Sequence, residues 1–208
     1  MALRRLLSYL GLAALTFSLG CSPEEPVVVD PETTDAPATV EEAADAATDD
    51  DTQADAAVQP ELAAFDEIQQ RIAELDRPAV VDYWSLACQP CMDEFPGLVR
   101  LHREHGERVA CVAVDVDFDG RKSKPPESYK EAVSEFLTEQ AAEFPNYLST
   151  TPSDEVFAAL EIISIPSVFV YNADGTVAKK FVDAGDTAGF TYEDDVIPYV
   201  KEMLASGE

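Results

Sequence analysis

The sequence predicts an α/β domain in which a mixed sheet is covered by helices on both faces. Two apolar runs, 79–84 and 109–114, have the length and composition of buried strands, and segments with helical spacing flank them. Further along the chain, strands at 167–171 and 176–182 are joined by the turn sequence Asn-Ala-Asp-Gly at 172–175, which is typical of a hairpin. Strands that alternate with helices and end in a hairpin indicate parallel and antiparallel pairing within one sheet.

The individual elements follow from the spacing of apolar residues. A helix is expected over 61–75, where apolar side chains recur every three or four positions: Leu62, Phe65, Ile68, Ile72 and Leu75. The remaining predicted elements are a helix from Pro90 to about His105 that is interrupted at Pro96, a loop at 119–127, a helix at 129–142, a short strand at 147–149, a short helix at 154–160 and a final helix at 193–205. Together they place the folded domain at residues 61–208.

The composition of the chain is strongly acidic. Its 208 residues include 41 Asp and Glu against 14 Lys and Arg, which gives a formal net charge of −27. Such a charge opposes binding to nucleic acid and electrostatic attachment to anionic membranes. The four cysteines are too few for a disulfide scaffold. The length fits one domain of ordinary size with additional segments, and we expect a monomer.

The first 21 residues have the pattern of an export signal. Arg4 and Arg5 precede an apolar stretch from 6 to 19, which is shorter than the roughly 20 residues that span a bilayer. The sequence Ser-Leu-Gly-Cys at 18–21 resembles the lipobox of bacterial lipoproteins, in which the cysteine carries the lipid, although a serine stands where that motif usually has leucine. The prediction is lipidation of Cys21, and the alternative is simple secretion.

Residues 22–60 are predicted to be a disordered acidic linker. They contain 12 acids and no Lys or Arg, and their one apolar run is the valine triplet at 27–29. Such a segment buries too little surface to offset its ordering entropy. It is expected to be a tether between a lipid anchor and the domain, or merely a solubilising spacer.

A Cys-x-x-Cys sequence lies where the strand at 79–84 leads into the next helix. Cys88 and Cys91 enclose Gln89 and Pro90, and the start of the helix would direct free N–H groups and its positive dipole end at Cys88. This environment favours the thiolate, which is the form that attacks disulfides. The spacing also brings both sulfurs to one helix face, where they can bond. The pattern predicts thiol–disulfide exchange.

A zinc site is the main structural alternative for such a cysteine pair, and it requires two further ligands. The other cysteines, Cys21 and Cys111, are isolated, and His102 and His105 lie on one predicted helix. We therefore expect no metal and no cofactor.

Three short sequences accompany the cysteine pair. An aromatic–Trp pair stands at 83–84, Glu-Phe-Pro at 94–96, and Ile-Pro at 165–166 before the hairpin. With the Cys-Gln-Pro-Cys sequence, they resemble the thioredoxin fold and, within it, the membrane-anchored thiol–disulfide oxidoreductases of cytochrome c maturation. The resemblance covers roughly residues 61–206, and the helix and strand at 128–149 resemble the insert of that subgroup.

The chain departs from this family at two positions. Ala87 stands where a tryptophan usually precedes the first cysteine, so we expect a more open surface beside Cys88. Cys111 stands at the position of the lysine that accompanies a buried acid in thioredoxin. We interpret Cys111 as a small buried residue rather than a redox group.

The resemblance implies a role for each reacting residue. Cys88 is the attacking thiolate, and Cys91 resolves the mixed disulfide. Asp82 corresponds to the buried acid of thioredoxin, and Glu94 to the active-site acid of the membrane-anchored subgroup. Either acid can move the Cys91 proton if burial raises its pKa towards neutrality.

The resemblance also implies a substrate-binding side. Pro166 is expected to be cis and to leave the backbone of Ile165 free to pair with an extended peptide. Trp84 is expected to pack under the active-site loop, and Pro90 belongs to that loop between the cysteines. The expected partners are protein thiols and disulfides, with a membrane thiol carrier as electron donor.

The resulting prediction is an exported, lipid-anchored thiol–disulfide oxidoreductase that acts as a reductant in the periplasm or another extracytoplasmic space. A disulfide oxidase or isomerase of the same fold stays open, because the residues do not fix the reduction potential. A peroxiredoxin-like peroxidase is a rival, since Ser85 stands where those enzymes have Thr, but Val81 replaces their proline. A copper-binding chaperone would need a His after His105, and a redox-inactive interaction domain would not need both cysteines.

Overall fold

The computed structural model describes residues 57–182 and 189–206. The predicted export signal, the lipidation site at Cys21 and the linker up to residue 56 lie outside the described residues. The rest of the predicted linker, residues 57–60, packs on the domain.

Two hydrogen bonds hold this segment. The Val58 N–H donates to Thr138 Oγ1 at 2.9 Å, and the Gln59 amide donates to Ser134 Oγ at 2.6 Å. The packed region therefore begins slightly before residue 61.

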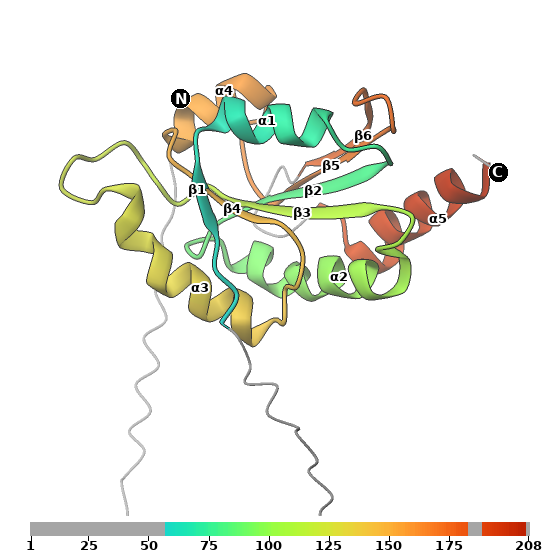
Figure 1. Cartoon of the computed structure of the whole chain (residues 1–208), viewed down its shortest axis with the longest axis horizontal. Coiled ribbons are helices and arrows are strands. Elements are labelled where there is room, and N and C mark those ends of the chain that lie inside the picture. Colours follow the sequence, from blue (N-terminus) through green and yellow to red (C-terminus); the bar gives the residue numbers. More distant parts are fainter. Residues whose placement is uncertain (1–56, 183–188, 207–208) are drawn as a thin grey trace, which may run out of the picture. The chain divides into compact units, whose positions relative to one another are not determined.

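A six-stranded mixed sheet forms the centre of the domain, in the order β1-β4-β3-β2-β5-β6 (Figure 1). The first four strands of this order pair in parallel, whereas β5 is antiparallel to β2 and β6 is antiparallel to β5. The mixed sheet predicted from the sequence is confirmed. The strands are β1 (Glu61–Ala63), β2 (Ala79–Trp84), β3 (Ala110–Asp115), β4 (Asn146–Ser149), β5 (Ser167–Tyr171) and β6 (Val177–Val182).

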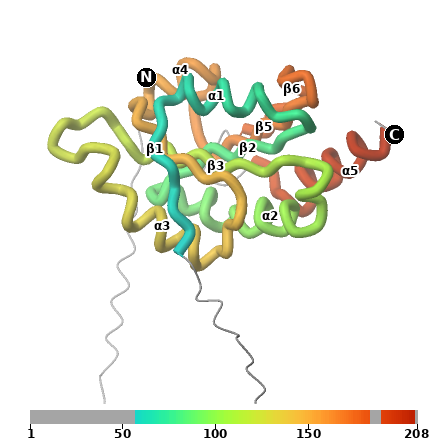
Figure 2. The backbone as a smooth tube through the Cα atoms, in the orientation of Figure 1, coloured from blue at the N-terminus to red at the C-terminus, as the bar shows by residue number. Residues whose placement is uncertain are grey.

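Helices cover both faces of the sheet, as Figures 1 and 2 show. The helices α1 and α4 lie on one face, and α2, α3 and α5 lie on the other, so that each face has its own apolar core. The helical elements are α1 (Phe65–Ala73), α2 (Gln89–His105), the 3₁₀ turn η1 (Pro126–Tyr129), α3 (Lys130–Glu139), α4 (Ser153–Leu160), the π-helical turn η2 (Tyr192–Val196) and α5 (Ile197–Ser206).

The predicted helix over 61–75 is wrong at its start. Residues 61–63 form the edge strand β1, which pairs in parallel with β4, and α1 begins only at Phe65. The Phe65 N–H donates to Thr151 Oγ1 at 3.0 Å, and the Ala64 N–H to the Glu67 carboxylate at 3.2 Å. Pairing with the sheet overrides the helical spacing at this point because it satisfies the backbone of both strands.

The predicted interruption at Pro96 is also wrong, because α2 is continuous from Gln89 to His105. Proline removes one backbone N–H and crowds the preceding turn, which commonly kinks a helix. Here Phe95 and Leu98, on either side of Pro96, are fully buried. Their packing against the sheet holds the helix across the proline.

The other predicted elements are confirmed with ends shifted by a few residues, except that the final helix is preceded by η2. The hairpin turn closes as expected: the Gly175 N–H donates to the Asn172 carbonyl at 3.0 Å, and Gly175 has a φ of 79°. A positive φ of this kind favours glycine.

The central strand β2 leads into the loop that contains Cys88. All six of its residues are buried, and its side chains alternate between the two cores. Val80 and Trp84 belong to the core under α2 and α3, whereas Val81 and Tyr83 belong to the core under α1 and α4. By this alternation, Asp82 places a carboxyl group within the apolar layer between the sheet and α2.

Candidate active site

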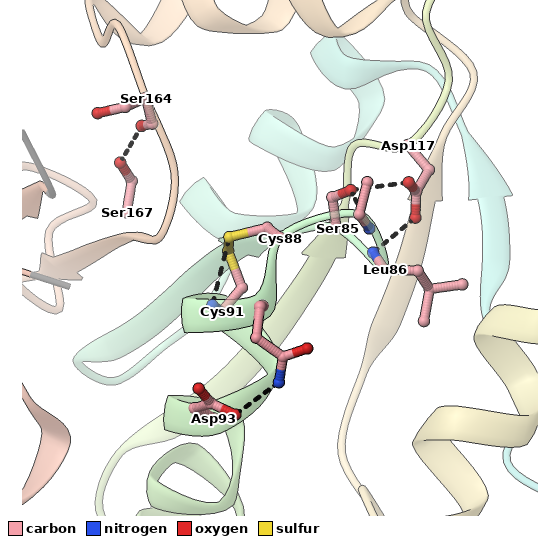
Figure 3. Close-up of a disulfide and its surroundings, with 10 residues drawn as sticks. Ser85, Leu86, Cys88, Cys91, Asp93, Asp117, Ser164 and Ser167 are labelled. Atoms are coloured by element: carbon pink, nitrogen blue, oxygen red, sulfur yellow. Dashed lines mark hydrogen bonds between the residues drawn. A yellow bond between two sulfur atoms is a disulfide. The ribbon is translucent and has the colours of Figure 1, made fainter. Parts of the chain in front are cut away.

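The predicted cysteine pair forms a disulfide at the start of α2 (Figure 3). The two sulfur atoms are 2.06 Å apart, and the Cα atoms are 5.3 Å apart. Cys88 is the N-cap of the helix, and its Sγ accepts a hydrogen bond from the Cys91 N–H at 3.3 Å. Pro90 lies in the first helical turn, where the missing N–H of a proline costs nothing. Helix N–H groups therefore point at Cys88, as the sequence predicts.

The two cysteines differ in access to solvent. Cys91 is 1% exposed and belongs to the core under α2, whereas Cys88 is only half-buried. An incoming disulfide can therefore reach Cys88 and not Cys91. This asymmetry fits an attacking cysteine followed by a resolving one.

Asp117 anchors the loop that leads from β2 into the disulfide, and the sequence analysis missed it. Its carboxylate accepts hydrogen bonds from Ser85 Oγ at 2.7 Å and from the Leu86 N–H at 2.8 Å (Figure 3). Ser85 Oγ in turn accepts the Ala87 N–H at 3.0 Å. The available signal is the recurrence of aspartate at 115, 117 and 119, at and just after the end of β3.

Trp84 packs under this loop, as the sequence predicts. Its ring lies 5.0 Å from that of Phe95 on α2 and 4.8 Å from that of Phe136 on α3, measured between centroids. The indole is 1% exposed, so it supports the loop from below and offers no surface to a substrate.

A surface pocket of about 340 Å³ opens beside Cys88. The expected opening at Ala87 is present, because Ala87 is exposed and lines this pocket. Ile165 lines the other side, and the Ile165–Pro166 peptide bond is cis. In Figure 3 the disulfide lies between Asp117 and the Ser164–Ser167 loop, whose two serines are joined by a 2.8 Å hydrogen bond. The structure thus brings Cys88, Ile165 and the loop of Pro166 together around one pocket.

Asp82 is buried on β2, in the layer between the sheet and α2, and has one hydrogen-bond partner among the described residues. It is 2% exposed, and its Oδ2 accepts the Tyr192 hydroxyl at 2.8 Å, whereas its Oδ1 has no partner among the described residues. Burial raises the pKa of Asp82 to about 7; the hydrogen bond from Tyr192 opposes this rise, and the charge of Glu94 adds to it. A carboxyl group with this pKa can accept or release a proton near neutral pH.

Glu94 lies closer to the surface than Asp82. It is half-buried on α2, and its Oε2 accepts the Tyr192 backbone N–H at 2.8 Å. With Gly97, Arg100 and Tyr192 it lines a surface pocket of about 270 Å³. Tyr192, which the sequence analysis did not single out, is therefore the residue that contacts both predicted acids.

Cys111 lies on β3 opposite Val80 and is free and buried. Burial raises the pKa of its thiol to about 12, against a smaller opposing effect of Arg77. Its thiol therefore stays protonated at neutral pH, in keeping with the interpretation of Cys111 as a small buried residue.

Within residues 57–182 and 189–206, no group of three or more His, Cys, Asp or Glu residues is placed to hold a metal ion. In the same part of the chain, no helix has both the length and the apolar character needed to cross a bilayer.

No family model matches the chain. Among solved structures, it is similar to a thioredoxin-like protein in its oxidised form, with 15% identity, coverage of 66% of this chain and 84% of the other, and a TM-score of 0.50. An uncharacterised thioredoxin-like protein from Porphyromonas gingivalis matches with 21% identity, coverage of 64% and 79%, and a TM-score of 0.49. A secreted disulfide oxidoreductase from Mycobacterium tuberculosis matches with 20% identity, coverage of 64% and 83%, and a TM-score of 0.46. The fold of the described domain is thioredoxin-like, with a Cys-x-x-Cys pair in disulfide geometry at the start of α2.

Proposed function

We propose that this chain is an exported thiol–disulfide oxidoreductase that exchanges disulfides with protein substrates and acts as a reductant. One observation carries the proposal: the disulfide at the start of α2 joins Cys88, which is half-buried and lines a surface pocket, to Cys91, which is 1% exposed. The pocket beside Cys88, with Ile165 on its rim, supports an extended protein segment as the substrate.

The reaction begins with the reduced pair. The Cys88 thiolate attacks one sulfur of a substrate disulfide, and the other substrate sulfur leaves as a thiolate that takes up a proton. Cys91 then loses its proton and attacks Cys88 Sγ, which closes the Cys88–Cys91 disulfide and releases the second substrate sulfur. The substrate gains two electrons, and the protein loses two. A dithiol donor, for which we propose a membrane thiol carrier, returns the pair to its reduced form.

Asp82 and Glu94 are the proposed acceptors of the Cys91 proton. Cys91 is buried in the layer that contains Asp82, so its proton cannot pass directly to bulk water. We expect Asp82→Asn and Glu94→Gln each to slow resolution of the mixed disulfide more than its formation, because Cys88 attacks from the solvent side. The double variant is expected to be less than additive, since both acids serve one proton transfer.

Insulin reduction by the full chain tests the exchange reaction. Cys88→Ser is expected to abolish turnover, and Cys91→Ser to trap a mixed disulfide through Cys88. Cys111→Ala is the matched control, because it removes the remaining described cysteine without touching the pair, and it is expected to keep turnover. Undiminished turnover in Cys88→Ser would overturn the proposal. Equal turnover with hydrogen peroxide as substrate would favour a peroxidase instead.

The direction of electron flow depends on the reduction potential of the pair. A value of about −250 mV or lower indicates a reductant, and one of about −120 mV an oxidant. Equilibration of the full chain with glutathione or dithiothreitol buffers measures it directly.

Export with a lipid on Cys21 is a separate part of the proposal, supported by the charged start, the short apolar stretch and the Ser-Leu-Gly-Cys sequence. Mass spectrometry of the mature N-terminus in a bacterial host tests it. An unmodified chain that begins at another residue would make this a secreted protein without an anchor.

A further inference from the structure

Tyr192 links the two acids of the candidate site through two different groups. Its hydroxyl donates to Asp82 Oδ2 at 2.8 Å, and its backbone N–H donates to Glu94 Oε2 at 2.8 Å. Asp82 is on β2 and Glu94 on α2, whereas Tyr192 comes from η2, 110 residues after Asp82 along the chain. One residue from a distant element thus contacts both carboxyl groups, and Glu94 lies one helical turn after Cys91.

The surrounding chain holds Tyr192 in this place. Thr191 caps η2, with its Oγ1 accepting the Asp194 N–H at 3.0 Å and its own N–H donating to Asp195 Oδ2 at 2.9 Å. The ring of Tyr192 lies directly against Gly97 of α2, where an added Cβ would stand 2.2 Å from Tyr192 Cβ. Glycine at this helical position therefore permits the approach of Tyr192, which is 1% exposed.

The groups around the Tyr192 hydroxyl come from three elements. The helix α2 contributes Glu94, β2 contributes Asp82, and β3 contributes Cys111, with Asp115 further along the same strand face. The side chain next to Asp82 on β5 is the apolar Val168. Among the described residues, the Tyr192 hydroxyl is the sole hydrogen-bond donor to Asp82.

We propose that Tyr192 is a positioning residue that sets the pH range of disulfide exchange, by holding the Asp82 carboxylate as the acceptor of the Cys91 proton. The inference rests on the proposed function. During oxidation of the dithiol, the proton moves from Cys91 Sγ to the Asp82 carboxylate, and it returns when the disulfide is reduced. The Tyr192 hydroxyl keeps its own proton throughout and stabilises the charged form of Asp82.

The direction of the effect follows from the hydrogen bond. A donor to a carboxylate favours the charged form, so its removal raises the pKa of the acid. Tyr192 lowers the pKa of Asp82 in this way, from within an environment whose burial has raised that pKa to about 7. Below its pKa, Asp82 already carries a proton and cannot accept another. Loss of the hydroxyl therefore moves the acidic limit of exchange to higher pH.

Tyr192→Phe in the full chain tests this inference, because it removes the hydroxyl and keeps the ring against Gly97. Carboxyl ¹³C NMR of the oxidised protein follows the titration of Asp82 without any exchange reaction. We expect the midpoint to rise by about one pH unit, since a hydrogen bond to a charged group is worth that much or more. The acidic limb of the rate of mixed-disulfide resolution is expected to rise equally, which slows resolution at pH 7 by about fivefold.

Tyr171→Phe is the matched control. Tyr171 is also buried, and its hydroxyl is hydrogen-bonded to that of Tyr83 at 3.4 Å. It lies, however, in the core under α1 and α4. It is expected to leave the Asp82 midpoint and the pH profile unchanged. A Tyr192→Phe profile that superimposes on the wild-type profile would overturn the inference and leave the proposed function intact. Absence of exchange in the wild-type chain would overturn the proposed function, while the NMR titration still reports on Tyr192.

Discussion

Two buried aspartates lie on neighbouring strands of the same sheet, and they are held in different ways. Asp82 on β2 is 2% exposed, and it accepts a hydrogen bond at 2.8 Å from the hydroxyl of Tyr192, in the C-terminal part of the domain. Asp115 on β3 is 0% exposed and accepts the Asp117 N–H at 3.1 Å, from two residues along its own chain. Burial is the largest cause of the raised pKa of each aspartate, and the charge of a nearby acid raises it further. That acid is Glu94 for Asp82 and Asp117 for Asp115.

The difference lies in what each aspartate is connected to. Asp82 shares Tyr192 with Glu94, which lines a surface pocket, so it is linked to the cysteine helix and to the protein surface. Asp115 holds the backbone of Asp117, whose carboxylate in turn fixes the loop at Ser85 and Leu86. We infer that equally buried acids serve different purposes here: Asp82 takes part in proton transfer, and Asp115 supports the shape of the loop before Cys88.

The hydrogen bonds of Asp117 to the loop before Cys88 predict the largest change in stability. Asp117→Ala removes the acceptor of two hydrogen bonds to a charged group, and we expect the free energy of unfolding to fall by about 3 kcal/mol. Urea unfolding measures it. Asp119→Ala is the control, because Asp119 is an exposed acid nearby that pairs with Arg121, and we expect little change. Equal stability of the two variants would show that Asp117 does not hold the loop.

The burial of Asp82 predicts that replacing it raises the stability of the protein in a pH-dependent way. Burial raises the pKa of Asp82 from the 3.8 of a free aspartate to about 7 in the native state. Between these two pH values the native state binds more protons than the unfolded state, so stability falls as pH rises. A shift of about 3 units corresponds to about 4 kcal/mol. Because Asn leaves a buried amide without a partner, at a cost of about 1–3 kcal/mol, Asp82→Asn is expected to stabilise the protein by about 2 kcal/mol at pH 8 and not at pH 4.

Asp115→Asn is the matched variant for this experiment. It too is expected to become more stable than wild type as pH rises, because the pKa of Asp115 is also raised. Only Asp82→Asn is expected to change the pH profile of disulfide exchange. If both variants change that profile to the same extent, the distinction between the two aspartates fails.

The contact between Gly97 and Tyr192 predicts a smaller loss. A methyl group at position 97 would overlap the Tyr192 side chain, which costs about 2 kcal/mol, and the better helix propensity of alanine returns about 1 kcal/mol. We therefore expect Gly97→Ala to lower the free energy of unfolding by about 1 kcal/mol in a urea titration. It is also expected to raise the NMR midpoint of Asp82, because the displaced ring takes its hydroxyl with it. An unchanged midpoint would mean that Gly97 does not set the position of Tyr192.

The fold was largely predictable because its strands and helices follow local patterns of apolar residues. The failures at 61–63 and Pro96 come from packing between distant segments. β1 forms because β4, more than 80 residues later, offers its edge, and α2 survives its proline because the sheet holds the turns on both sides. The local sequence around each segment does not indicate that β4 will pair with β1 or that the sheet will pack against α2.

The site was predictable only where its residues lie close together or match a known spacing. Cys88 caps the helix α2, Cys91 and Glu94 lie on that helix, and Asp82 lies on the strand before it. Asp117 comes from the loop after β3, and Tyr192 from η2. A lone Asp or Tyr in such a segment is indistinguishable from a solvated or core residue. The link between the acids depends on contacts across 110 residues, which no spacing rule encodes.

Glu94→Gln gives the smallest expected effect and the sharpest test of the link between the acids. The Gln amide oxygen can still accept the Tyr192 N–H, so the free energy of unfolding is expected to change by less than about 0.5 kcal/mol. The charge of Glu94 raises the pKa of Asp82, so its removal is expected to lower the NMR midpoint of Asp82, by less than about half a pH unit for a half-buried group in contact with solvent. This direction is opposite to that expected for Tyr192→Phe. Asp93→Asn, at an exposed neighbour on the same helix, is the control and is expected to leave the midpoint in place. If Glu94→Gln raises the midpoint, the variant has displaced Tyr192 rather than removed a charge, and the two acids are then connected through the position of that tyrosine alone.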